Sequence, residues 1–248
     1  MKIGLYLNPQ DASDRTGPQM RDGYLSLART ASDVGFDHIS AGQHYLSEFS
    51  QLQLIPFLSR VTGEVENMEI GTGVVLLPFH HPVDLAERVA TLDALHDGNT
   101  VFGVGAGYRD VEFDSFGIPK SERIPRLVEG LQLTKRLLTE TNVTYEGDHY
   151  AVDDVTIPVR PDDIDVWMAA NANVAVERAA RMTDAWYVNP HATISEIREQ
   201  KHEIYDPKRE ELGADTSVPV FREAFVAEST EAAKDVAHDH LWEKYQRY

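Results

Sequence analysis

The sequence predicts an α/β protein, a (β/α)8 barrel of the TIM type with seven βα units evident in its 248 residues. Short apolar runs alternate with longer amphipathic segments along the chain, which is typical of parallel strands that are each followed by a helix. No linker or low-complexity tract interrupts this alternation. We therefore expect a single barrel domain over residues 1–248.

Short runs rich in β-branched and aromatic residues define the expected strands. The first begins almost at the N-terminus, Pro78 ends the third, and the fourth contains alternating glycines. The predicted strands are Lys2–Leu7, His38–Ala41, Glu69–Leu77, Thr100–Ala106, Asp165–Ala170, Ala185–Asn189 and Pro219–Ala227.

Each of these strands is followed by a segment that has apolar residues at helical spacing. Gly35 ends the first segment, Pro82 begins the third, Asp97–Gly98 marks its exit, and Ser121 is expected to cap the fourth. The predicted helices are Gln19–Val34, Leu52–Val65, Pro82–Leu95, Ser121–Leu138, Ala172–Met182, Ile194–Leu212 and Ser229–Tyr248.

The chain departs from a regular barrel in two places. Residues 143–161, between the fourth helix and the fifth strand, indicate a hairpin-like excursion. No eighth strand follows the last helix, whereas a closed barrel of this type has eight. Either the protein is a seven-stranded variant, or a C-terminal unit is missing from the sequence.

Composition excludes several classes of site. The absence of cysteine excludes disulfides, thiolate zinc sites, iron–sulfur clusters and cysteine nucleophiles. No signal-peptide stretch opens the chain and no run of about 18 apolar residues occurs, so we expect a cytoplasmic protein that does not cross a membrane.

The charge balance is strongly acidic. The chain has 41 acidic and 23 basic residues, a net charge of -18, and only 7 of the basic residues are lysine. Such a surface repels nucleic acid and anionic lipid. Ordinary acidic solubility is one explanation, but the scarcity of lysine favours adaptation to molar salt, a halophilic surface.

Polar residues follow several of the predicted strands, and in a parallel barrel the active site lies at these strand ends. The ends carry histidine, asparagine or glycine, which would suit a planar polar ligand with a phosphate tail. The residues concerned are His44, His80, His81, Gly103, Gly105, Gly107, Asn171, Asn173 and His191.

Two patterns at these ends have simpler explanations. The series Gly103-x-Gly105-x-Gly107 lies within a strand and lacks the dinucleotide-binding spacing, so it either lets a flat ring approach the backbone or relieves crowding inside the barrel. The adjacent His80 and His81 point in different directions and have no carboxylate at helical ligand spacing, so we expect no metal site.

Several motifs in sequence order resemble one family. The segments are GFDHISAGQHYLSEF (residues 35–49), GTGVVLLPFHHPVDLAERVATLDALHDGNTVFGVGAGYRDVEFDSFG (71–117), TNVTYEGDHYAVDDVTI (141–157) and VWMAANANVAVERAARMTDAW (166–186). Together they are similar to the bacterial luciferase-like, flavin-utilising monooxygenases, almost to the end of the chain. The resemblance implies a (β/α) barrel that binds a flavin.

The resemblance also implies roles for individual residues. The residue matching His44 is a general base or stabiliser beside the flavin ring, and those matching Gly73 and Val74 form a non-prolyl cis peptide under the ring. The remaining cofactor-binding positions are Asn171 and Ala172 at the ring edge, and Gly105, Ala106, Tyr108 and Arg123 towards the phosphate.

This sequence departs from the family pattern at two of these positions. Gln43 stands where the family has an acid before the histidine, so we expect His44 to lack a charged neighbour. Ala106 stands where a basic residue is common. Phosphate capture would then depend on backbone N–H groups at a helix start and on Arg109 or Arg123.

The leading functional interpretation is an FMN-dependent monooxygenase that receives reduced FMN from an NAD(P)H-dependent flavin reductase and oxygenates a small organic substrate. Water would be excluded by apolar walls. The candidate wall residues are Tyr45, Phe79, Phe113, Phe116 and Trp186.

Three other interpretations stay open. The first is a deazaflavin-dependent dehydrogenase or reductase that transfers hydride. The second is a non-catalytic flavin-binding protein or silent subunit, although such a protein would not need His44. The last and least favoured is a barrel hydrolase. Family resemblance also implies a homodimer through the helices of residues 52–65 and 83–95, whose apolar residues would equally suit packing on the barrel.

Overall fold

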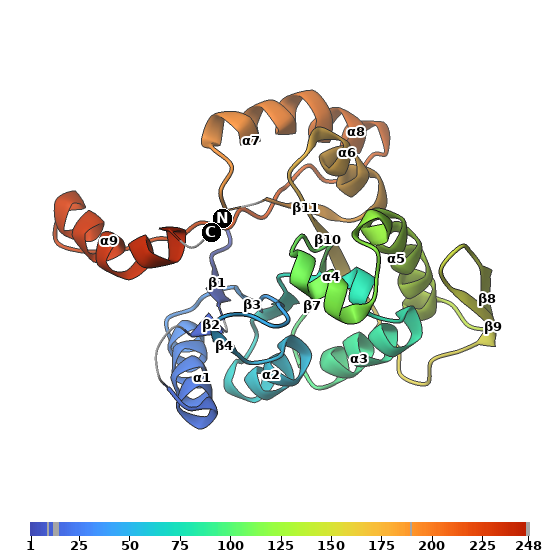
Figure 1. Cartoon of the computed structure of the whole chain (residues 1–248), viewed down its shortest axis with the longest axis horizontal. Coiled ribbons are helices and arrows are strands. Elements are labelled where there is room, and N and C mark those ends of the chain that lie inside the picture. The colour runs from blue at the N-terminus through green and yellow to red at the C-terminus, as the bar shows by residue number, and fades with distance from the viewer. Residues whose placement is uncertain (9, 12–14, 189, 247–248) are drawn as a thin grey trace.

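The structure, a computed structural model, describes residues 1–8, 10–11, 15–188 and 190–246 and confirms an α/β fold (Figure 1). All strand pairs of its main sheet are parallel, in the order β1, β3, β5, β7, β10, β11. Their bounds are Gly4–Leu7, His38–Ala41, Glu69–Thr72, Thr100–Gly105, Asp165–Ala170 and Ala185–Val188. Short β6 (Val75–Leu76) also pairs with β7, just beyond the end of β5.

Helices surround these strands, and α1 and α3 begin close to where their sequence signals lie. Pro18 and Pro82 stand in the first turns of α1 and α3, where a missing N–H removes no helical bond. The α-helices are α1 (Gly17–Asp33), α2 (Leu54–Val61), α3 (Pro82–Ala94), α4 (Asp110–Phe116), α5 (Arg123–Thr139), α6 (Asn173–Met182), α7 (Ile194–Gln200), α8 (Asp206–Glu211) and α9 (Thr230–Gln246).

One apolar core lies between the strands and the helices. The strand residues Ile39, Ile70 and Phe102 are fully buried in it, together with Leu58 and Leu131 from the helices. Each such side chain contributes roughly 1.5–3 kcal/mol to folding. Because this core holds the strands in place, the residues at the carboxyl ends of the strands have fixed positions.

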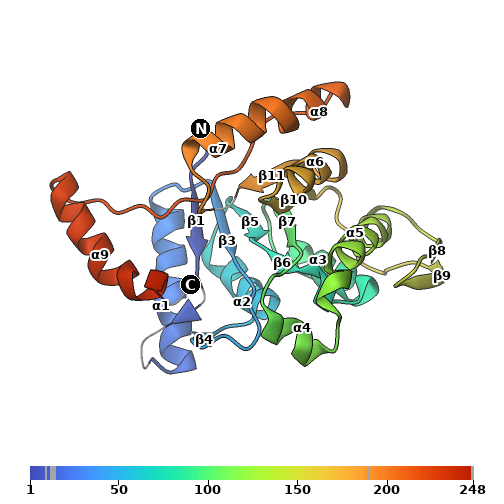
Figure 2. The same ribbon diagram turned by 45° about the horizontal axis from the view of Figure 1, so that its top comes forward.

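The predicted hairpin is confirmed. Strands β8 (Val143–Glu146) and β9 (Ala151–Val155) pair antiparallel and lie beyond α5, at the edge of the molecule (Figure 2). The buried carboxylate of Glu129 on α5 accepts hydrogen bonds from the backbone N–H groups of His149 and Tyr150, at 2.8–3.0 Å. A second small ribbon pairs β2 (Gln10–Asp11) with β4 (Ser50–Gln51).

Some predicted elements are wrong in extent. The strand of residues 69–77 breaks after Thr72 and resumes as β6, and the helix of residues 52–65 ends at Val61 in a 3-10 turn, Thr62–Glu64. Ser121 caps no helix, because it lies in the 3-10 turn Lys120–Glu122 and α5 begins at Arg123. Residues 194–212 form two helices separated by a π-helical turn, Lys201–Tyr205. Asn189, Arg247 and Tyr248, included in predicted elements, lie outside the described residues.

The predicted seventh strand, residues 219–227, is reduced to a single parallel bridge between Val188 and Val220. A strand forms only where a neighbouring strand satisfies the hydrogen bonds of its backbone groups. Among the described residues, the end of this segment packs on no such neighbour, since Val226 is fully exposed. Phe221 nevertheless packs on Tyr6 of β1, with ring centroids 4.5 Å apart. The strands therefore form a partial barrel, and α9 stands apart from its body (Figure 1).

Across the described residues, the helices are too short or too polar for any of them to span a lipid bilayer.

Candidate functional site

The carboxyl ends of β3 and β7 bring together residues far apart in the sequence. The loop after β3 carries His44, and the loop after β7 carries Tyr108 and Arg109 before entering α4. The His44 and Tyr108 rings meet edge to face, with centroids 5.9 Å apart. Tyr108, which we expected towards a phosphate, therefore lies against the histidine expected to do the chemistry.

His44 has a buried acidic partner. Its Nδ1 lies 3.2 Å from Oε1 of Glu112, a carboxylate on α4 with no exposed surface. The same oxygen accepts the backbone N–H of Tyr45 at 2.8 Å. We assign the hydrogen of the His44 contact to Nδ1, because a carboxylate oxygen accepts hydrogen bonds, and this assignment leaves Nε2 as the ring atom that can exchange a proton.

The expectation that His44 lacks a charged neighbour is therefore wrong. Gln43 does replace the acid before the histidine, but Glu112 supplies a carboxylate from an element that sequence analysis did not predict. A signal for that element was present: Phe113 and Phe116 are spaced by three residues, and Gly117 ends the helix with a positive φ of 65°.

Gln43, in the same loop, forms hydrogen bonds with groups from three segments of the chain. Its Oε1 accepts the backbone N–H of Leu76 at 2.9 Å and lies 3.1 Å from Nε2 of His80, while its Nε2 donates to the hydroxyl of Tyr45 at 3.1 Å. Burial lowers the pKa of the His80 imidazole to about 4 and raises the pKa of the Tyr45 hydroxyl. Both groups are therefore neutral at pH 7 and serve as fixed hydrogen-bonding supports.

The peptide bond between Gly73 and Val74 is cis, as the resemblance implied. Both residues are half-buried, whereas Thr72 and Val75 on either side are buried. A Cβ on Gly73 would lie 3.2–3.4 Å from Tyr6, Tyr187 and Ser40. This half-buried link, which we call the Gly73–Val74 surface, carries no charged side chain.

The glycines of β7 make room for that link. A Cβ on Gly103 would lie 2.0 Å from the carbonyl oxygen of Thr72, and one on Gly105 would lie 2.8 Å from Cγ2 of Val74. Of the two explanations for these glycines, relief of crowding accounts for the geometry. Their contribution to a ring site is indirect, through the position of the Gly73–Val74 surface.

Tyr187 of β11 borders this surface. Burial raises the pKa of its hydroxyl to about 12, and a hydrogen bond with Ser40 acts in the opposite direction. The hydroxyl is therefore a neutral donor. Half-buried backbone, neutral hydroxyls and the absence of a Cβ at the centre fit an aromatic ring system such as a flavin or deazaflavin.

Four of the five expected wall residues form one aromatic cluster beside His44. Phe79 packs on Phe113 and Phe116 at centroid distances of 4.7 and 5.0 Å, and Tyr45 packs on Phe116 at 4.7 Å. Trp186 lies elsewhere, with its Nε1 donating to the carbonyl of Ala170 at 2.9 Å. Within this cluster Phe79 and Phe113 are buried, whereas Phe116 is partly exposed.

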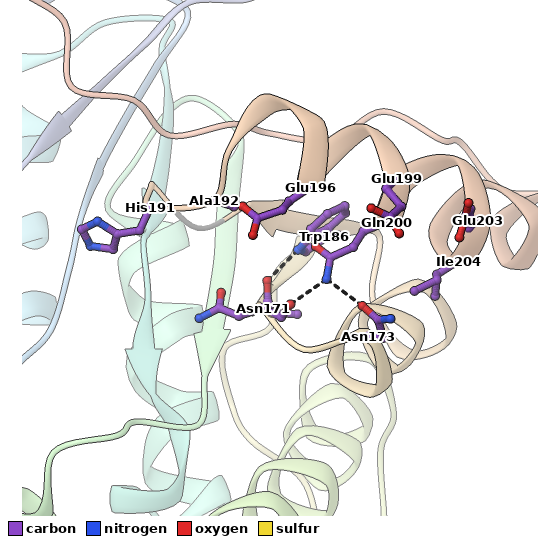
Figure 3. A pocket seen from close by; sticks show the side chains of 11 residues that line it. Asn171, Asn173, Trp186, His191, Ala192, Glu196, Glu199, Gln200, Glu203 and Ile204 are labelled. Carbon is purple, nitrogen blue, oxygen red and sulfur yellow. Dashed lines mark hydrogen bonds between the residues drawn. The ribbon is translucent and has the colours of Figure 1, made fainter.

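A cavity of about 430 Å³ opens at the carboxyl ends of β10 and β11 (Figure 3). Gln200 of α7 closes one side by donating to the carbonyl of Asn171 at 2.7 Å and to Oδ1 of Asn173 at 2.9 Å. Three carboxylates of α7 and the π-helical turn line the same side of the cavity as Gln200: Glu196, Glu199 and Glu203 (Figure 3).

The remaining residues expected to bind the ring edge or the phosphate of the cofactor lie in several places. Ala172 precedes the first residue of α6, beside the cavity that Asn171 lines, and Ala106 is half-buried at the end of β7. Nη1 of Arg123 donates to the carbonyl of Lys120 at 3.3 Å. Arg109 contacts Glu112 and the loop that carries His44.

No metal site emerges from the part of the chain that the structure describes, where no three histidine, aspartate or glutamate side chains are grouped to hold an ion.

The fold and its strand-end residues define a class: parallel-stranded α/β barrel proteins with a ligand site at the carboxyl ends of the strands. The model of the luciferase-like monooxygenase family matches residues 1–248, so the chain belongs to that family. Over 167 residues it is 32% identical to an F420-dependent glucose-6-phosphate dehydrogenase of Intrasporangium calvum, covering 63% of this chain and 50% of that protein. The chain thus spans about half the length of such curated relatives.

Solved structures support the fold. The monooxygenase RslO1 from Streptomyces bottropensis superposes with a TM-score of 0.91 at 24% identity, covering 100% of this chain and 78% of that one. The oxygenating constituent of 3,6-diketocamphane monooxygenase from Pseudomonas putida, solved with FMN, has a TM-score of 0.81 at 18% identity and covers 99% and 73%.

Proposed function

We propose that this protein is a monooxygenase that uses reduced FMN and molecular oxygen to oxygenate a small organic substrate. The observation that carries the proposal is the contact between Nδ1 of His44 and the buried carboxylate of Glu112, beside an aromatic wall. Reduced FMN, when bound, would supply the electrons that activate oxygen.

His44 is the proton-handling group in this proposal. Because Glu112 accepts its Nδ1 hydrogen, Nε2 can take a proton from the substrate or return one without turning the ring. Glu112 also stabilises the imidazolium formed in such a step. The aromatic cluster of Tyr45, Phe79, Phe113 and Phe116 keeps water away from the reacting groups.

The Gly73–Val74 surface would hold the ring of the cofactor, and Asn171 and Ala172 would meet its edge. An NAD(P)H-dependent flavin reductase would supply reduced FMN. A homodimer through α2 and α3 is part of the proposal, but it would use their outer faces, because Phe57, Leu58 and Leu85 are buried in the subunit's own core.

Stopped-flow mixing with oxygen tests the proposed reaction. Anaerobic protein with one equivalent of reduced FMN should reoxidise with a phase that free FMN lacks, and His44→Ala should bind FMN but lose that phase. His202→Ala is the matched control, since His202 is exposed on the π-helical turn. An identical time course for free and protein-mixed FMN would contradict the proposal.

A second candidate is deazaflavin-dependent dehydrogenation of an alcohol. The relative that is 32% identical is named as an F420-dependent dehydrogenase. Nε2 of His44 could take the hydroxyl proton of an alcohol while hydride leaves its carbon for the deazaflavin. A silent subunit, the third alternative, would have no use for this histidine–carboxylate pair.

A further inference from the structure

The guanidinium of Arg109 is directed at the loop that carries His44. Its Nη1 donates to the carbonyl of Tyr45 at 2.8 Å, and its Nη2 lies 3.4 Å from the carbonyl oxygen of Leu46. We propose that Arg109 is a positioning residue that fixes His44 through this loop, and that it does not bind a phosphate. The inference rests on the proposed function, in which His44 handles the proton.

The loop needs such support because of its backbone conformation. Leu46 has a φ of 50°, in the left-handed region that is unfavourable for a residue with a side chain. Leu46 is also 59% exposed, so burial of its side chain does little to hold that conformation. Polar contacts from other elements must therefore fix it.

Those contacts surround the backbone next to His44. Gln53 donates to the carbonyl of His44 at 3.3 Å, Glu112 accepts the N–H of Tyr45, and Arg109 donates to the next two carbonyls. Arg109 and Glu112 lie one turn apart at the start of α4. From this one short helix, Glu112 accepts a backbone N–H group of the loop and Arg109 donates to its backbone carbonyls.

Arg109 also balances the charge of Glu112. Its Nη1 lies 3.6 Å from Oε1 of that fully buried carboxylate, while its own side chain is 23% exposed. A buried carboxylate is costly without an opposite charge nearby. One guanidinium thus stabilises both the loop and the acid that pairs with His44, and contact with a phosphate would require it to release these carbonyls.

Two substitutions and a matched control test this assignment. Arg109→Gln removes the charge and shortens the side chain, whereas Arg109→Lys keeps the charge and tests partial rescue. Arg136→Gln is the control, because Arg136 likewise donates to a carbonyl, that of Thr144, and pairs with a glutamate, Glu140, far from the site. Should the glutamine variant fail to fold, the lysine variant is measured in the same way.

The first measurement is amide hydrogen exchange of Tyr45, which requires no cofactor. We expect exchange to become at least tenfold faster in Arg109→Gln, to be partly restored in Arg109→Lys, and to be unchanged in Arg136→Gln. The second compares the anaerobic binding of reduced FMN and reduced riboflavin. The ratio of their dissociation constants should stay within about twofold of the wild type, because the two ligands differ only in the phosphate.

Unchanged Tyr45 exchange would overturn the proposal, as would a tenfold loss of preference for FMN over riboflavin, which would make Arg109 a phosphate ligand. A third measurement is turnover, where kcat should fall at least tenfold in Arg109→Gln with KM within threefold. If neither flavin binds to the wild type, the proposed function fails, and the exchange experiment alone decides the role of Arg109.

Discussion

Oε1 of Glu112 lies 3.2 Å from Nδ1 of His44, although 68 positions separate the two residues in the sequence. The carboxylate is fully buried, and its second oxygen has no hydrogen-bond partner among the described residues. The fold places an acid behind the histidine at the carboxyl ends of the strands, where a general base needs its orientation fixed.

Replacement of Glu112 should affect turnover more than binding. In Glu112→Gln the amide cannot stabilise an imidazolium, so we expect kcat to fall roughly 10–100-fold. The affinity for reduced FMN should stay within about threefold, since Glu112 lies behind His44. Steady-state kinetics and anaerobic fluorescence titration measure the two effects. Glu140→Gln, which alters an exposed ion pair, is the control, and an unchanged kcat in Glu112→Gln would remove Glu112 from the mechanism.

Gly103→Ala should strongly destabilise the protein. The added Cβ would lie 2.0 Å from the carbonyl oxygen of Thr72, so the backbone before the Gly73–Val74 link must move. Overpacking of this kind costs about 1–3 kcal/mol or more. Urea denaturation measures the loss. Gly17→Ala is the control, because its Cβ would meet nothing within 4 Å and the change should stay within about 0.5 kcal/mol. Equal stability of both variants would contradict this account of the glycines.

Local sequence patterns predicted most of the sheet. The strands His38–Ala41 and Asp165–Ala170 have the predicted bounds, because short buried apolar runs leave little choice of conformation. The segment of residues 219–227 has the same apolar character but forms only the bridge at Val220, since strand formation there depends on a neighbouring edge that local sequence does not reveal.

The site was predictable only in part. His44 was a candidate from its position after a strand, and its role came from the family resemblance. The resemblance also implied the cis bond at Gly73–Val74, which the structure confirms. Glu112 was missed because its contact with His44 joins two strand-end segments, a relation that spacing along the chain does not encode. Arg109 was expected near a phosphate because its charge was considered without the loop carbonyls that it meets.

His80 should make the stability depend on pH. Burial lowers the pKa of its imidazole in the folded state to about 4, below the value of about 6.5 for an unfolded chain. As the pH falls through the window from about 6.5 to 4, the unfolded state takes up the proton first, and the free energy of unfolding declines by up to about 3 kcal/mol.

Urea denaturation at pH 7.5, 6 and 5 measures this decline. His80→Gln should show a smaller loss over the same range, whereas His202→Gln, with 74% of the side chain exposed, should behave like the wild type. These three pH values avoid the titration of Glu69, whose pKa is lowered to about 2 by its hydrogen bond with His38 and whose contribution to stability is lost only below pH 5. Parallel curves for all three proteins would contradict the role of His80.

The net charge of -18 predicts a stability that rises with salt. Screening weakens repulsion between carboxylates, and the Debye length falls from about 10 Å at 0.1 M salt to about 3 Å at 1 M. We expect the Tm to increase by several degrees between 0.1 and 2 M KCl. A Tm that is flat or falls over this range would contradict a halophilic surface.

The identity of the cofactor tests the central claim most directly. Purified protein in molar KCl is titrated anaerobically with reduced FMN and, in parallel, with reduced deazaflavin, and binding is followed by fluorescence. The account predicts that reduced FMN binds at micromolar or tighter affinity and at least tenfold more tightly than the deazaflavin. A preference for the deazaflavin would contradict the monooxygenase and assign His44 and Glu112 to hydride transfer, and binding of neither would contradict the flavin site itself.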